Sequence, residues 1–106
     1  MKLSLFLRPQ AEADIDNAID FIAKHNPEKA LAFDRAVFES FDLLCIMAKI
    51  GTPYPTSNRK LNGLRMWFVK GFEKYLIFYI PYGNYLEVFR VLHSAQDRDS
   101  ILLELE

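Results

Sequence analysis

The sequence predicts an α+β fold in which a two-helix antiparallel hairpin packs on a small antiparallel sheet. The first observation is a helical spacing of apolar residues through the first half of the chain, interrupted once by an Asn-Pro pair. The second is a set of three aromatic-rich strand segments in the second half, joined by links of hairpin length. We therefore expect an N-terminal strand, the helical hairpin, a three-strand C-terminal meander and a short C-terminal helix, in a single domain over residues 1–106.

The N-terminal part should form a short strand over residues 3–7 and then a helix from Pro9 to Lys24. Proline suits the first turn of a helix, because its missing N–H would have no helical partner there. Apolar side chains then recur every three or four residues and form one narrow stripe: Ala11, Ile15, Ala18, Ile19 and Ile22. The small side chains at one end of this stripe permit close packing against a neighbouring element.

A second helix is predicted after a short break. Asn26 suits the N-cap, Pro27 the first helical position, and Glu28 the positive end of the helix dipole. The apolar stripe of this helix consists of Ala30, Phe33, Val37, Phe41, Leu44, Cys45 and Ala48. We expect the helix to end near Ile50, with Gly51 as the C-terminal signal. Because the break is short, the two helices should form an antiparallel hairpin.

The second half of the chain is predicted to form most of the sheet. Residues 51–63 contain two prolines and several turn formers, so we expect a loop there, with room for a brief irregular strand. Three strands follow with two short links between them: residues 64–70, 75–80 and 85–92, linked by 71–74 and 81–84. Links of this length produce an antiparallel meander. The middle strand is apolar on both faces, so both of its faces should be covered.

The chain is expected to end in a short helix. Ser94-x-x-Asp97 has the spacing of a capping box, with aspartate in place of the usual glutamate, so the helix should start at Ser94. The apolar edge of this helix would consist of Ile101, Leu102 and Leu105. Core packing explains the phenylalanines at positions inside the stripes and strands: Phe33, Phe41, Phe78 and Phe89.

Composition and charge exclude several classes of protein. The net charge is −1, but residues 51–94 carry six basic and two acidic side chains, which indicates one basic face on a nearly neutral protein. Dedicated nucleic-acid binders are usually more basic than this. The single cysteine, Cys45, excludes an internal disulfide, and its place on an apolar stripe favours a small core residue.

The sequence favours neither a cofactor nor a membrane location. No cysteine or histidine cluster has the spacing of a metal site, so we expect no metal and no cofactor. No apolar run reaches the roughly 18 residues that a membrane helix needs. The apolar run near the N-terminus is too short for a signal peptide and stops at Pro9. We therefore expect a cytoplasmic protein without a membrane partner.

The run from Arg90 to Asp97 allows two interpretations. RNA cleavage needs a general acid or base and cations that stabilise the phosphorane. His93 could transfer the proton, and Arg65 and Arg90 could bind the phosphate if their strands are neighbours. In the structural interpretation His93 bonds the backbone or a carboxylate at a strand–helix junction, Arg90 pairs with Glu87 or an acid on a helix, and Asp97 caps the last helix. The sequence leaves both interpretations open.

Over essentially its whole length the chain resembles the RelE/ParE superfamily of bacterial toxins. The resemblance is carried by four stretches: Pro9-x-Ala11-x-x-Asp14-Ile15, Leu61-x-Gly63-Leu64-Arg65, Tyr75-Leu76-Ile77-Phe78-Tyr79, and Val88-Phe89-Arg90-Val91-Leu92-His93-x-Ala95-x-Asp97. The last stretch is the most specific of the four. Many similar proteins have arginine before the final aspartate where this chain has Gln96, so one positive charge is missing from the motif.

The resemblance implies the toxin component of a type II toxin–antitoxin, or plasmid stabilisation, module. The RelE-like branch cleaves mRNA on the ribosome, whereas the ParE-like branch inhibits DNA gyrase. The His-x-Ala-x-Asp exit is more similar to the ParE-like branch, so we expect a protein that binds and inhibits gyrase and is neutralised by a cognate antitoxin, in an oligomeric complex. Two alternatives stay open: a ribosome-dependent mRNA endonuclease that uses Arg65, Arg90 and His93, and an inactive toxin fold that only binds antitoxin.

The resemblance also implies that an antitoxin tail wraps a groove between the helical hairpin and the aromatic sheet. Aromatic and arginine side chains are enriched at such interfaces. The candidates for partner contacts are Trp67, Tyr82, Tyr85 and Arg90.

Overall fold

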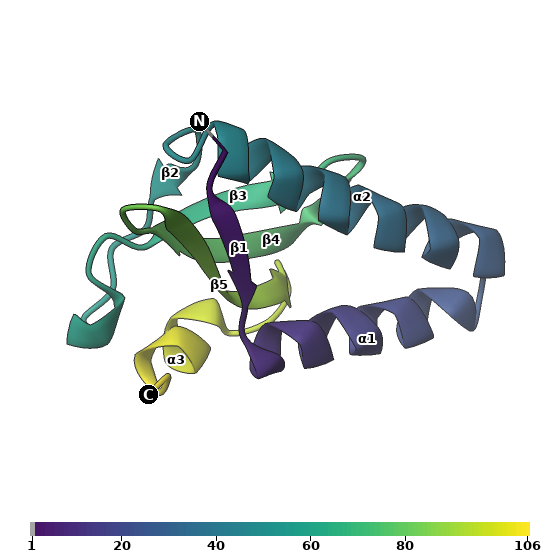
Figure 1. Cartoon of the computed structure of the whole chain (residues 1–106). Helices are drawn as coiled ribbons and strands as arrows, with labels where there is room; N and C mark the ends of the chain where they lie inside the picture. Colours follow the sequence, from purple (N-terminus) through teal and green to yellow (C-terminus); the bar gives the residue numbers. More distant parts are fainter. Residues whose placement is uncertain (1) are drawn as a thin grey trace.

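The computed structural model describes residues 2–106 and has helices on both faces of one sheet (Figure 1). Its elements follow in chain order: β1 (Ser4–Leu7), α1 (Pro9–Ala23), α2 (Pro27–Ile46), β2 (Thr52–Pro53), a short 3₁₀ helix (Arg59–Leu61), β3 (Arg65–Val69), β4 (Phe72–Pro81), β5 (Tyr85–His93) and α3 (Arg98–Leu103). The predicted α+β architecture is confirmed, including the helical hairpin and the C-terminal meander. In the described residues no helix is both long enough and apolar enough to cross a membrane.

The five strands form one mixed sheet in the order β1-β5-β4-β3-β2. The expectation of a purely antiparallel sheet is wrong at one edge, because β1 pairs with β5 in parallel, with Leu5 opposite Leu86. The helical hairpin explains this pairing. It returns the chain to the point where β1 begins, and there the Leu3 N–H donates to the Cys45 carbonyl at 2.9 Å. Since β3 and β5 are both antiparallel to β4, both then run in the direction of β1.

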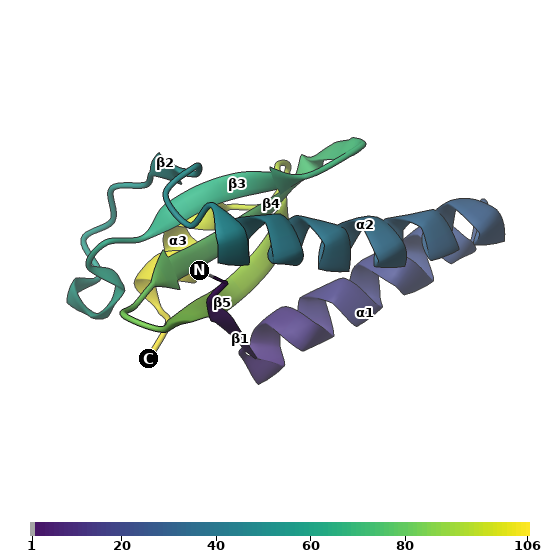
Figure 2. The same ribbon diagram turned by 45° about the horizontal axis from the view of Figure 1, so that its top comes forward.

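The sheet is covered on both faces, as its aromatic middle strand predicts. The helical hairpin packs on one face and extends beyond the end of the sheet, while α3 lies on the opposite face (Figures 1 and 2). Ile77 and Tyr79 of β4 belong to the helix-side core, and Phe78 and Ile80 to the core under α3. Phe33, Phe41, Phe78 and Phe89, with the thiol-bearing Cys45, are all buried, as expected from the sequence.

The second helix ends earlier than the sequence predicts. The last helical residue is Ile46, four positions before Ile50, because Met47 leaves the helical region at φ −121° and ψ 65°. The reason is tertiary. The buried Tyr79 hydroxyl donates to the Ala48 carbonyl at 2.7 Å and accepts the Gly51 N–H at 3.0 Å. Gly51 therefore allows close approach to Tyr79, instead of ending a helix.

The fourth strand begins earlier than the sequence predicts. The predicted link over residues 71–74 is reduced to a tight turn at Gly71, whose φ of +83° suits a residue without a side chain. Phe72 already pairs with Val69, and its ring packs edge-on against Phe33 with centroids 5.2 Å apart. Burial of this ring against α2 explains why the strand extends into residues that otherwise read as a link.

Candidate functional site

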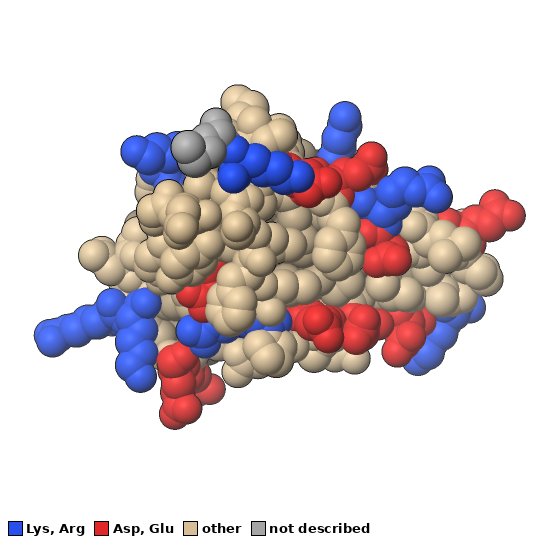
Figure 3. All heavy atoms as spheres, in the orientation of Figure 1, with Lys and Arg blue, Asp and Glu red and all other residues tan. Residues whose placement is uncertain are grey.

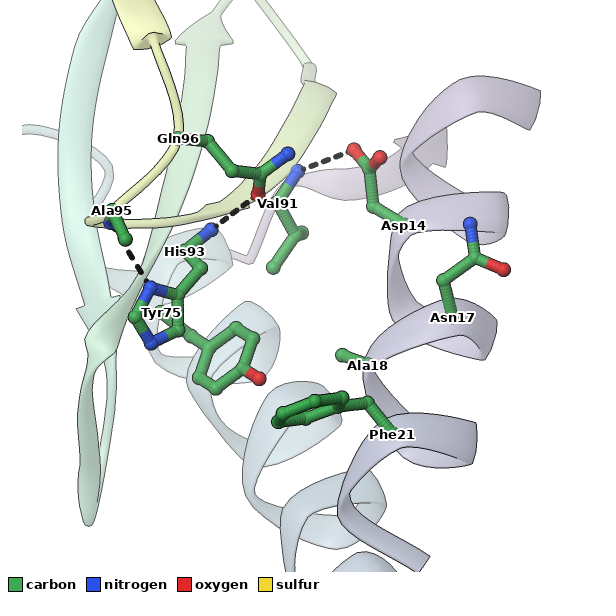
Figure 4. A pocket seen from close by; sticks show the side chains of 9 residues that line it. All are labelled: Asp14, Asn17, Ala18, Phe21, Tyr75, Val91, His93, Ala95 and Gln96. Carbon is green, nitrogen blue, oxygen red and sulfur yellow. Dashed lines mark hydrogen bonds between the residues drawn. The ribbon is translucent and has the colours of Figure 1, made fainter. Parts of the chain in front are cut away.

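The end of β5 and the adjacent side of α1 enclose a pocket of about 460 Å³. Figure 4 shows its nine lining residues, which come from α1, β4, β5 and the turn after β5: Asp14, Asn17, Ala18, Phe21, Tyr75, Val91, His93, Ala95 and Gln96. The C-terminal run singled out in the sequence therefore does lie at a hollow in the surface. A volume of this size is in the range of small-molecule and side-chain pockets.

Arg90 is held by Asp14 of α1. The guanidinium donates from Nε to Asp14 Oδ2 at 2.7 Å and from Nη2 to Oδ1 at 2.8 Å, and the Val91 N–H donates to Oδ2 at 3.0 Å. The hydrogen bonds that Arg90 donates to Asp14 raise the pKa of Arg90, although burial opposes this. Glu87 is not the partner of Arg90, since it pairs with Arg8 at 2.6 Å. The bidentate geometry of Arg90 is thus already occupied within the chain.

His93 is part of the turn that follows β5. Its Nδ1 accepts the Ala95 N–H at 3.0 Å, and its own backbone N–H donates to the side-chain oxygen of Gln96 at 2.8 Å. The imidazole packs edge-on against Tyr75, with ring centroids 4.9 Å apart. Because Nδ1 is an acceptor, this hydrogen-bond pattern assigns the proton of the neutral ring to Nε2. Gln96, which the sequence marks only as a missing charge, closes this turn.

Arg65 does not join Arg90 and His93. The nuclease interpretation requires the strands of Arg65 and Arg90 to be neighbours, and this condition is not met, because β4 lies between β3 and β5. Arg65 lies opposite Tyr79 of β4, and His93 lies opposite Tyr75 of the same strand. Arg65 and His93 are therefore separated by four residues along β4, which is about 13 Å. The Arg65 guanidinium donates to the carbonyls of Gly51 at 2.6 Å and of Lys49 at 3.2 Å.

The aromatic candidates for partner contact lie in two other places. Tyr82 and Tyr85 stack at the β4–β5 turn with ring centroids 4.9 Å apart, and each is more than a third exposed. Trp67 stacks on Phe68 and packs half-buried against the helix-side core. The tyrosine pair lies at the opposite end of β5 from the pocket, so it forms a separate surface.

Three residues of the pocket, Asp14, Asn17 and Phe21, have no role that the sequence predicts. Asp14 lies beside the apolar stripe of α1, where a charged residue normally marks a solvent-exposed position. Asn17 and Phe21 follow it on the same side of the helix, because residues three and four apart are neighbours. In the sequence, only the helical spacing of these three residues indicates that they lie together. That spacing points to a pocket only when the position of β5 beside α1 is known. Among residues 2–106 no group of three or more His, Cys, Asp or Glu side chains is placed to hold a metal ion.

The last helix begins at Arg98, with its N-cap at Asp97, whereas the sequence predicts a start at Ser94. Asp97 is the N-cap, and its carboxylate accepts the Ser100 hydroxyl at 2.9 Å and the Ser100 N–H at 3.4 Å. Ser94 instead continues the ladder, with its N–H donating to the Lys74 carbonyl at 2.7 Å. The capping role expected of Asp97 is therefore confirmed, but the predicted capping box is wrong, because residues 93–96 form a turn.

We expect Asp97→Ala to lower the free energy of unfolding by about 1 kcal/mol, the usual cost of losing an N-cap. Ser94→Ala is the matched control, and it should change stability by less than about 0.5 kcal/mol because the Ser94 side chain is exposed. Urea unfolding followed by circular dichroism measures both values. Equal losses in the two variants would contradict this assignment of the cap.

The fold should weaken in alkaline solution through its covered tyrosines. Burial raises the pKa of Tyr75 and of Tyr79 above the ordinary value. A raised folded pKa means that the unfolded chain loses the proton first. The stabilisation is therefore fully present below pH ~10 and is lost as the pH rises through the folded pKa. Urea unfolding across this range should show the decline, and Tyr75→Phe should make it shallower. An unchanged slope in Tyr75→Phe would contradict the expected contribution of Tyr75.

Comparisons with known proteins agree with this fold. A sequence model of the family described as "ParE toxin of type II toxin-antitoxin system, parDE" matches residues 5–98, which extend from β1 to the first residue of α3. A solved structure titled "Chromosomal ParDE TA system from P. aeruginosa" superposes with a TM-score of 0.70 and 22% sequence identity, covering 87% of this chain and 96% of that chain. At this identity the likeness concerns the fold alone. No curated protein sequence matches the chain.

Proposed function

Since the chain belongs to the ParE toxin family of type II toxin–antitoxin systems, we propose that it inhibits DNA gyrase by direct contact and is neutralised by a cognate antitoxin. The observation that carries the proposal is the pairing of Arg90 with Asp14. Its guanidinium is held by Asp14 through two hydrogen bonds, and Arg65 donates to backbone carbonyls about 13 Å along β4 from His93. A nuclease needs cations that are available to the phosphate beside a proton-transfer group. The geometry therefore favours action by binding.

We also propose that the Tyr82–Tyr85 pair contacts a protein partner. Of the four candidate contacts these two are the most exposed, while Trp67 is half-buried and Arg90 is paired with Asp14. Stacked tyrosines present a large rigid surface at low entropic cost, which is typical of binding hot spots. Trp67 and Arg90 lie elsewhere on the sheet, so each would contact a partner only through its own exposed edge.

The test is supercoiling of relaxed plasmid by purified gyrase with an excess of this protein. We expect supercoiling to be inhibited, and inhibition to be relieved by the cognate antitoxin. Tyr82→Ser/Tyr85→Ser should fold normally and bind its partner at least tenfold more weakly. Tyr75→Phe serves as the matched aromatic control because it keeps the ring.

Two outcomes would replace the proposal. Undiminished supercoiling together with codon-phased mRNA cleavage in primer extension, lost in His93→Ala, would establish the endonuclease. Normal growth during expression without antitoxin, with tight antitoxin binding retained, would establish a toxin fold that only binds antitoxin.

A further inference from the structure

The helix α2 carries large apolar side chains on its outer surface as well as in the core. Leu31, Phe38 and Ile46 are 69%, 44% and 62% exposed. They follow one another at spacings of seven and eight residues, so they lie on one face of the helix. Single exposed hydrophobic residues are common on protein surfaces, but an aligned set indicates an interaction site. In Figure 2 no other element of the described chain crosses in front of α2.

Two charged residues lie between these apolar side chains on the same face. Arg35 comes four residues after Leu31, and Asp42 comes four residues before Ile46. Figure 3, in the orientation of Figure 1, shows basic and acidic side chains along α2 with uncharged surface between them. The outer stripe of α2 is therefore apolar, basic, apolar, acidic and apolar in chain order: Leu31, Arg35, Phe38, Asp42 and Ile46.

The charges of the outer stripe are hardly used within the chain. Within residues 2–106 Arg35 forms no ion pair, and Asp42 pairs only with Lys2, at 3.5 Å. The two side chains of that pair are 60% and 68% exposed, and such exposed pairs contribute little to stability. Glu28 at the start of the helix and Lys49 just after its end are also exposed, and neither forms an ion pair within the described residues. These charges are therefore available to another molecule.

The order of the outer stripe is complementary to itself. Leu31 and Ile46 are equally far in sequence from the centre of the stripe, which lies next to Phe38, and so are Arg35 and Asp42. A second α2 turned end to end would place leucine against isoleucine and arginine against aspartate, with the two phenylalanine rings together at the centre. A two-fold interface needs this property, because each contact between two residues occurs twice with the copies exchanged.

The two ends of the helix extend the match. Glu28 and Lys49 are symmetric about the same centre, so an antiparallel second copy brings the glutamate of each chain beside the lysine of the other. The antiparallel arrangement also places the positive end of each helix dipole beside the negative end of the other. A partner of different sequence would not require this symmetry in the stripe.

We propose that α2 is the contact surface between two copies of this chain, related by a two-fold axis that passes near Phe38. The apolar residues of the outer stripe, which extends over about 22 Å from Leu31 to Ile46, would supply the contact area. The contacts of Arg35 in one copy with Asp42 in the other would set the antiparallel direction. One pair of helices makes a small interface, so the dimer should exist in a concentration-dependent equilibrium with the monomer. The dimer does not depend on gyrase as the target.

Analytical ultracentrifugation of the full chain without antitoxin measures this equilibrium. We expect the sedimenting species to change from monomer to dimer as the concentration rises. Leu31→Ser should raise the dissociation constant at least about tenfold, because it removes apolar contact at both ends of the symmetric interface. Leu103→Ser is the matched control, since it replaces another exposed leucine on α3, across the sheet from α2, and should leave the equilibrium unchanged. A chain that stays monomeric at all concentrations would overturn the proposal.

Charge reversal tests the two-fold arrangement itself. Arg35→Asp and Asp42→Arg should each weaken self-association roughly tenfold at low salt and less at high salt, because each places like charges opposite one another at both contacts. An equimolar mixture of the two variants should dimerise again, since opposite charges then meet at both contacts. The double variant Arg35→Asp/Asp42→Arg should likewise dimerise by itself. A mixture that remains monomeric would contradict the antiparallel pairing.

The antitoxin is the other occupant that these measurements identify. If Leu31→Ser weakens antitoxin binding and leaves self-association unchanged, the outer stripe belongs to the antitoxin and the proposed dimer is wrong. Sedimentation of the purified chain is independent of supercoiling, so failure of the dimer and failure of gyrase inhibition are distinguishable.

Discussion

Asp14→Ala is expected to lower the free energy of unfolding by about 3 kcal/mol, the usual cost of removing one partner of a covered ion pair. The Asp14 and Arg90 side chains are only 12% and 20% exposed. The substitution leaves the Arg90 guanidinium without its counter-charge and the Val91 N–H without an acceptor. Both groups were removed from water on folding, and neither has another partner placed to replace the carboxylate.

Three variants decide whether this loss belongs to the ion pair. Asp16→Ala changes an exposed acid on the same helix and should cost less than about 0.5 kcal/mol. Asp14→Asn keeps an acceptor for Val91 but not the charge, so its loss should be intermediate. Asp14→Leu/Arg90→Met removes both charges and should recover part of the stability, as isosteric apolar replacements of buried pairs do. Denaturant unfolding measures all of them. A small loss in Asp14→Ala would contradict the expected contribution of the ion pair to stability.

The Asp14–Arg90 pair also shows what a sequence can and cannot predict about this site. Helical spacing around Ile15 and Ala18 predicts the buried face of α1, because that pattern is local. The partner of Arg90 lies 76 residues earlier in the chain, and the sequence offered several acids of equal merit. Only the packing of α1 against the free edge of β5 selects Asp14. The run from Arg90 to Asp97 identifies the family correctly, but its chemistry depends on this distant contact.

The elements themselves were predictable wherever their signals are local. The second helix begins as expected because Asn26 caps it, with its side chain accepting the Lys29 N–H at 3.1 Å. Two of the errors have tertiary causes. The parallel pairing of β1 follows from the path of the helical hairpin, and the early end of α2 follows from hydrogen bonds to Tyr79. Gln96 could not be assigned because its role is a bond to the backbone of His93.

Gly51→Ala is expected to be about as costly as losing Asp14, at roughly 3 kcal/mol. A Cβ at this position would overlap the Tyr79 hydroxyl and lie 2.9 Å from Tyr79 Cε1 and 3.0 Å from the Met66 carbonyl. A flexible surface side chain could move aside, but Tyr79 is fully buried. Its hydroxyl is also fixed by bonds to Ala48 and Gly51. Overpacking of about 1–3 kcal/mol is thus joined by a lost hydrogen bond of about 1 kcal/mol.

A matched glycine and a second substitution make this expectation specific. Gly83→Ala, in the exposed β4–β5 turn with nothing within 4 Å of the new Cβ, should change stability by less than about 0.5 kcal/mol. Tyr79→Phe removes the hydroxyl that the new methyl meets. The Gly51→Ala/Tyr79→Phe double variant should therefore lose less stability than the sum of the losses in the two single variants, since both substitutions remove the same hydrogen bond. Strictly additive losses in denaturant unfolding would show that Gly51 is needed for a reason other than its approach to Tyr79.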